Sequence, residues 1–60
     1  MKLIPNGKFL VVELWNIQEG EVKAIFNSEK EAKNFIKENN LPLYNGFEGY
    51  EVQLDYDIVT

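Results

Sequence analysis

The sequence predicts a small α+β domain whose elements run strand, strand, helix, strand. Three observations support this fold class: an apolar, β-branched stretch at Lys8–Ile17, a helix-start signal at Ser28, and strict alternation over Gly49–Val59. Alternation of apolar and polar residues is typical of a half-buried strand. Its apolar positions are Tyr50, Val52, Leu54, Tyr56 and Ile58, and its polar positions are Glu51, Gln53, Asp55 and Asp57.

The N-terminal half is expected to form a β-hairpin. Met1–Ile4 is interpreted as a short apolar arm, and Pro5-Asn6-Gly7 as a turn. Lys8–Ile17 is apolar on both faces, which favours a central strand that is covered on two sides. A turn at Gln18-Glu19-Gly20 then leads into a second strand at Glu21–Phe26.

The helix begins with a capping box, in which Ser28 accepts from a backbone N–H three residues on and Glu31 reaches back to Ser28. Asn39-Asn40 and then Pro42 end it. Its apolar stripe is narrow and consists of Ala32, Phe35 and Ile36.

The last strand is expected to lie antiparallel beside the first, because the helix must cross the sheet after the loop at Leu41–Glu48. The result is a single domain over residues 1–60, with a three-stranded antiparallel sheet in the order 2-1-3 and one helix on one face.

The composition excludes several classes of function. The 60 residues include no cysteine and no histidine, so neither disulfides nor the usual zinc ligands can support so small a core. The net charge is −4 and all six cations are lysine, which disfavours direct nucleic-acid binding. No segment resembles a membrane span or a signal peptide, and we expect a cytoplasmic protein.

Catalysis is not expected. The chain lacks histidine, which is the commonest general base, cysteine, which is the best thiol nucleophile, and arginine, which is the usual residue for binding anions. Ser28, the only serine, is explained as a helix cap, and Thr60, the only threonine, is the last residue. No catalytic residue, cofactor or metal ligand is therefore assigned.

The acidic face of the last strand is a candidate contact surface. Its carboxylates are Glu51, Asp55 and Asp57, and Glu13 is expected beside them on the central strand. The simplest interpretation is a solvated face that also discourages edge pairing. The alternatives are a small metal- or ligand-binding protein that uses this face, and a mimic of a nucleic-acid backbone that binds a basic partner.

The second face of the sheet is a candidate protein interface, because one helix cannot cover two apolar faces. The pattern leaves open whether the helix covers Leu10, Val12 and Leu14 or the opposite set. Cover by the N-terminal arm and the Leu41–Phe47 loop is the alternative to an interface. The predicted partner or dimer contacts are Phe9, Val11, Trp15, Ile17, Tyr44 and Phe47, with Trp15 as the anchor.

The segment Phe26-Asn27-Ser28-Glu29-Lys30-Glu31-Ala32, between a glycine-turned hairpin and an alternating strand, resembles small uncharacterised domains of phages and Gram-positive bacteria. These begin their helix with a similar F-x-S-x-x-x-A segment, and the resemblance implies a ββαβ fold without functional residues. By analogy with small acidic phage proteins of this size, we expect a phage-type modulator or inhibitor of a host protein, such as a component of antiviral defence. The expected function is a non-catalytic, homodimeric protein-binding module, and a further alternative is a structural accessory subunit.

Overall fold

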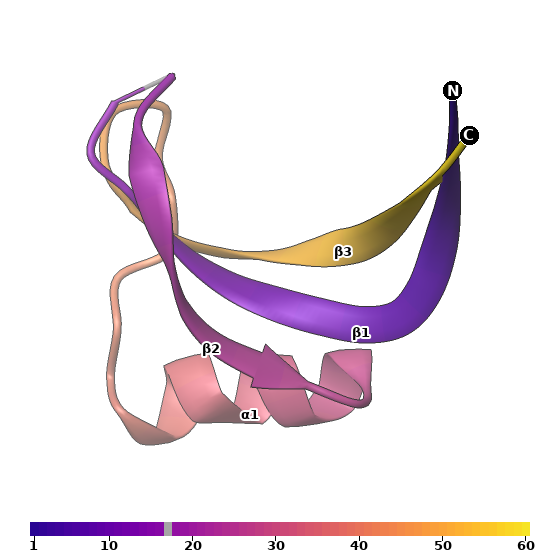
Figure 1. The fold of residues 1–60 in the computed structure, drawn as a ribbon. Coiled ribbons are helices and arrows are strands. Elements are labelled where there is room, and N and C mark those ends of the chain that lie inside the picture. Colours follow the sequence, from indigo (N-terminus) through magenta and orange to yellow (C-terminus); the bar gives the residue numbers. More distant parts are fainter. Residues whose placement is uncertain (17) are drawn as a thin grey trace.

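The computed structural model describes residues 1–16 and 18–60 and contains three strands and one helix. The elements are β1 (Lys2–Leu14), β2 (Gly20–Phe26), α1 (Glu29–Glu38) and β3 (Gly49–Val59). The strands form one antiparallel sheet in the order β2-β1-β3, and α1 lies against one face of it (Figure 1). The predicted α+β class, element order and sheet order are confirmed.

β1 is longer at its start than the sequence indicated. The expected arm and turn belong to this strand, since Lys2 to Pro5 pair with Val59 to Tyr56. The pairing resumes at Phe9, so the three residues 6–8 bulge out opposite Asp55. Gly7 there has a φ of +80°, which glycine adopts without strain. Pairing with the long alternating β3 therefore overrides a local turn signal, and the chain bulges instead of reversing.

β1 also ends earlier than expected, at Leu14. Trp15 lies in the following turn, where its backbone N–H donates to the Glu19 carbonyl at 2.9 Å. The Asn16 side chain accepts from the N–H groups of Gln18 and Glu19 at 2.7 and 2.8 Å. This side-chain capping of the turn explains why the strand does not continue, and Ile17 lies outside the described residues.

The core lies between α1 and the face of the sheet that carries Val11. Val11 and Ala32 are fully buried and Ile36 is 6% exposed. The partly buried residues packed against them are Phe9, Ala24, Phe26, Phe35, Leu41, Tyr50 and Val52. The helix thus covers Phe9 and Val11, so the prediction that these two lie on an uncovered interface is wrong.

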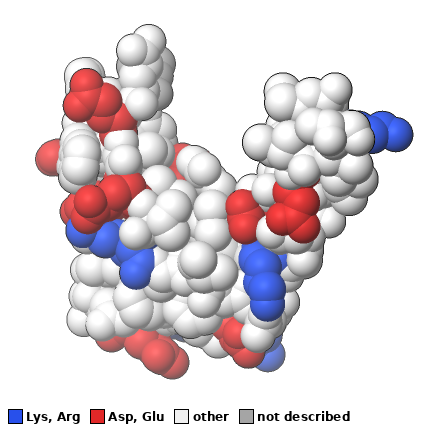
Figure 2. All heavy atoms as spheres, in the orientation of Figure 1, with Lys and Arg blue, Asp and Glu red and all other residues white. Residues whose placement is uncertain are grey.

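The opposite face of the sheet is concave. Both ends of the sheet rise away from α1, and Figure 2 shows the hollow between them. Val12 lies on this face and is only 7% exposed, although α1 is on the other side. The curvature of the sheet therefore shields its own centre, which the sequence pattern did not reveal. The N-terminal arm does not fold back over this hollow, because it pairs with β3.

The single helix α1 spans 10 residues, and no helix in the described part of the chain has the length and apolar character needed to cross a membrane.

The Ser28 half of the predicted capping box is present, because the Ser28 Oγ accepts from the Glu31 N–H at 3.2 Å, whereas the described contacts include no bond from the Ser28 N–H to the Glu31 side chain. At the other end, the Asn39 amide donates to the Phe35 carbonyl at 2.8 Å. Asn40 then adopts a left-handed conformation with φ of 52°. Both ends of α1 are thus set by local side-chain chemistry, as the sequence indicated.

We expect Ser28→Ala to lower the free energy of unfolding by about 1 kcal/mol, because it removes the acceptor for the Glu31 N–H. Urea unfolding followed by circular dichroism measures this change. Ser28→Asp is the matched control, since it keeps an acceptor and should stay close to the wild type. Equal destabilisation by both substitutions would contradict the capping role.

Candidate interaction surfaces

The terminal ribbon, defined here as residues 2–5 of β1 and 56–59 of β3, is an exposed apolar structure. β2 pairs with β1 only from Phe9 to Leu14, so the ribbon has two strands alone. Figure 1 shows it rising away from α1, with both chain ends at its tip. Its exposed apolar residues are Leu3, Ile4, Tyr56, Ile58 and Val59.

Both faces of the terminal ribbon carry apolar groups. Leu3 lies opposite Ile58 on one face, and Ile4 and Val59 share the other face with Lys2 and Asp57. An isolated two-stranded ribbon is marginally stable in water. The sequence pattern did not predict this surface, although the apolar arm at Met1–Ile4 and the alternation of β3 both contribute to it.

The predicted aromatic contacts gather at the opposite end of the molecule. Trp15 is 52% and Phe47 is 80% exposed, while Tyr44 is partly buried. A cavity of about 250 Å³ lies between the end of β1 and the loop that joins α1 to β3. Its lining includes Trp15 and Leu43. The structure thus places these three aromatic residues near one end, away from Phe9 and Val11.

The acidic face of β3 is smaller than predicted. Glu51 lies opposite Val12, on the concave side, and Asp55 and Asp57 share that side by alternation. Glu13 lies opposite Tyr50 on the side of α1, so its predicted place beside Glu51 is wrong. Successive side chains along a strand point to opposite faces of the sheet. The pair Val12–Glu51 and the next pair, Glu13–Tyr50, therefore lie on opposite faces.

Two of these carboxylates hold the bulge of β1. The Asn6 side chain donates to Asp55 Oδ2 at 2.8 Å and to Asp57 Oδ1 at 3.2 Å. Asp55 Oδ1 also accepts from the Tyr56 N–H at 3.0 Å. Within residues 1–16 and 18–60, no three acidic, cysteine or histidine side chains are grouped to hold a metal ion. The observed role of this acidic pair is to fix the entry to the terminal ribbon.

Glu13 is the centre of a polar cluster on the side of α1. The Tyr50 hydroxyl donates to Glu13 Oε2 at 2.9 Å, and Trp15 Nε1 donates to Oε1 at 3.1 Å. Lys23 Nζ lies 3.4 Å from Glu13 Oε1 and also contacts Glu21. The cluster therefore connects all three strands with the hairpin turn.

The titration of this cluster follows from its contacts. The hydrogen bond from Tyr50, followed by that from Trp15, lowers the pKa of Glu13 below its ordinary value of 4.5. The same bond to Glu13 raises the pKa of Tyr50 above 10.0, because ionisation would remove the donor. The contact with Glu21 raises the pKa of Lys23 in turn. These shifts favour the charged forms of Glu13 and Lys23 and the neutral form of Tyr50, which are the forms that make the observed contacts.

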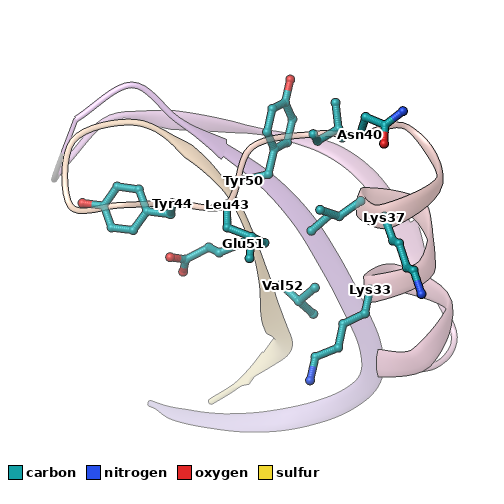
Figure 3. Close-up of a pocket in the computed structure, with 10 residues that line it drawn as sticks. Lys33, Lys37, Asn40, Leu43, Tyr44, Tyr50, Glu51 and Val52 are labelled. Atoms are coloured by element: carbon teal, nitrogen blue, oxygen red, sulfur yellow. The ribbon is translucent and has the colours of Figure 1, made fainter.

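A groove of about 790 Å³ runs between α1, the outer side of β3 and the loop that joins them. Its apolar lining includes Ile36, Leu41 and Val52. Lys33 and Lys37 project from α1 at its rim, and Figure 3 shows Val52 on β3 beside them. The sequence did not predict this groove, because it depends on how far α1 lies from the edge of the sheet.

Tyr50→Phe should destabilise the protein between about pH 5 and pH 9, because it removes the main hydrogen bond to the Glu13 carboxylate. A lowered carboxyl pKa contributes stability that is present above 4.5 and is lost as the pH falls through the folded-state value. The difference from the wild type should therefore shrink in acid, and again above pH 10.0 as Tyr50 ionises. Melting temperatures across the pH range test this, with Tyr44→Phe as the control, and a pH-independent difference would contradict it.

Asn6→Ala should loosen the terminal ribbon, because it removes both side-chain bonds to Asp55 and Asp57. We expect a loss of about 1 kcal/mol in stability. Hydrogen exchange should accelerate more in residues 2–5 and 56–59 than in β2. Asn34→Ala, at an exposed position on α1, is the control. Uniform acceleration throughout the sheet would contradict a local role.

Comparisons with protein-family models, with curated proteins and with solved structures found no match to this chain. The surfaces of the chain that bear on its function are the exposed apolar ribbon, the aromatic end and the groove beside β3.

Proposed function

We propose that this protein is a non-catalytic protein-binding module that self-associates through its terminal ribbon. The observation that carries the proposal is an imbalance between exposed and buried apolar groups. Among the described residues, twelve large hydrophobic side chains are at least 40% exposed, whereas only four hydrophobic residues are buried. The resemblance to small phage domains is in keeping with a binding role.

This imbalance matters because the chain is so short. A domain of 60 residues buries a smaller fraction of its surface than a larger domain does, and this one has no disulfide to supplement its core. Exposed apolar patches on soluble domains commonly mark interaction sites. Burial of the terminal ribbon against a partner would stabilise the part of the sheet that has the least support.

A second copy of the chain is the partner that the ribbon fits. In a twofold dimer, the same patch on each copy meets itself, so apolar strips on the ribbon can cover one another. The ribbon face that carries Leu3, Tyr56 and Ile58 has no charged residue, and these side chains are 58%, 45% and 63% exposed, so this face can be buried against its own copy. The hairpin end suits self-association less, because Trp15 is already bonded to Glu13 within the chain.

We expect the protein to be a dimer whose melting temperature rises with concentration, and Ile58→Asp to convert it into a monomer. Ile58 is 63% exposed on the ribbon, so a charge there should not disturb the monomer's core. Sedimentation equilibrium and thermal melts over a dilution series measure both effects.

Phe47→Asp is the matched control for this experiment. Phe47 is also exposed but lies in the loop at the other end, so its replacement should leave the dimer intact. A monomeric wild type with a melting temperature independent of dilution would refute self-association. Loss of the dimer with Phe47→Asp alone would move the interface to the hairpin end.

A further inference from the structure

We propose that the open edge of β3 and the adjoining groove bind an extended segment of a partner protein, which adds a fourth strand to the sheet. This inference concerns a different surface from the terminal ribbon. It rests on the protein-binding class of the proposed function and is independent of self-association.

The backbone of β3 offers unused hydrogen-bonding groups beside the groove. The Tyr50 N–H donates to the Pro42 carbonyl at 2.8 Å, and the Tyr50 carbonyl accepts from the Tyr44 N–H at 3.0 Å. The backbone of Tyr50 therefore points away from β1, and by alternation so do those of Val52 and Leu54. No hydrogen bond between described elements reaches Val52 or Leu54 on this side.

The open stretch has defined limits. At one end, the loop already lies on the edge, since Leu43 forms a parallel bridge to Tyr50. At the other end, the Tyr56 N–H already donates a hydrogen bond to the Asp55 side chain, so it is not available to an added strand. Between them, Val52 and Leu54 present two N–H and two C=O groups, which is the pattern that an added strand uses.

The loop shows how closely a chain can approach this edge. A Cβ on Gly49 would lie 2.6 Å from the Leu43 carbonyl, so only glycine permits this contact. An added segment would continue along β3 from the point where the loop leaves it. The edge is thus used for strand addition within the chain itself, over one residue pair.

The groove provides a place for side chains of the added strand. Alternate residues of such a strand point toward α1, where Ile36, Leu41 and Val52 form an apolar lining. Lys33 and Lys37 stand at the rim from α1 (Figure 3). Lys37 forms no ion pair within the described part of the chain, whereas Lys33 pairs with Glu29 at 2.7 Å.

The charges around the edge define the chemistry of the segment. On the side of α1, the apolar lining favours apolar residues, and Lys37, which has no ion pair in the described part of the chain, favours a carboxylate among them. On the concave side, Glu51 and Asp55 favour lysine or arginine. A second β3 does not meet these conditions, because its own acidic face would lie beside Glu51 and Asp55. The occupant is therefore an extended segment in which basic residues alternate with apolar or acidic ones.

The probe for this inference is the capped peptide Ac-KVKEKV-NH2, which has the required alternation. Titration followed by heteronuclear NMR should shift the amides of Val52 to Leu54 and those of α1 in a saturable way. The rearranged peptide Ac-KKKVVE-NH2 has the same charge and composition, and its affinity should be lower by about tenfold. Equal binding of the two peptides, or no saturable shift at these residues, would overturn the proposal.

Two N-methylated peptides separate strand addition from charge attraction. One carries the methyl groups on the lysine amides and the other on the valine and glutamate amides. Only one of these sets faces β3 in an added strand, so one peptide should lose binding and the other should keep it. Equal effects of both modifications would overturn strand addition.

Variants of the protein complete the test. Leu54→Pro removes an outward N–H without removing a bond to β1, and proline is tolerated on edge strands in this way. It should abolish peptide binding, whereas Leu54→Ala should bind within about twofold of the wild type. Ile58→Asp should bind the peptide normally whether or not the protein dimerises, so failure of either proposal is recognised separately.

Discussion

The pairing of β1 with β3 along their full length determines most of what this protein buries and exposes. It places Val11 under α1 and Val12 in the concave face, and it extends the sheet beyond the reach of both β2 and α1. The bulge at residues 6–8 keeps the two strands in register past an irregular segment, with Asn6 bonded to both aspartates. The terminal ribbon, the acidic pair and the open edge all follow from this pairing.

Much of the fold was predictable because its signals are local or strictly periodic. The helix start at Ser28 and its end at Asn39-Asn40 depend on neighbouring residues, and both agree with the structure. The alternation of β3 correctly predicted a strand, but its apolar side chains are exposed from Leu54 onward, so only its first part is half-buried. The turn predicted at Pro5-Asn6-Gly7 failed because a distant strand offered a better arrangement of hydrogen bonds. Local turn chemistry cannot indicate such a partner.

The surfaces were less predictable than the elements. The pattern of β1 is apolar on both faces, so it does not indicate which face α1 covers, and Phe9 and Val11 were assigned to the wrong side. Glu13 was misplaced for a related reason, since its face depends on register with β3. The groove beside α1 depends on the distance between helix and strand edge, which no sequence period encodes.

Both chain ends lie together at the tip of the terminal ribbon, where Lys2 pairs with Val59. An affinity tag, a fluorescent protein or a surface linker attached at either end therefore emerges from the same place. Such a fusion would stand beside the ribbon and leave the groove along α1 open. The exposed turn around Gln18 and Glu19, far from that tip, is the better site for a small label when the ribbon must stay free.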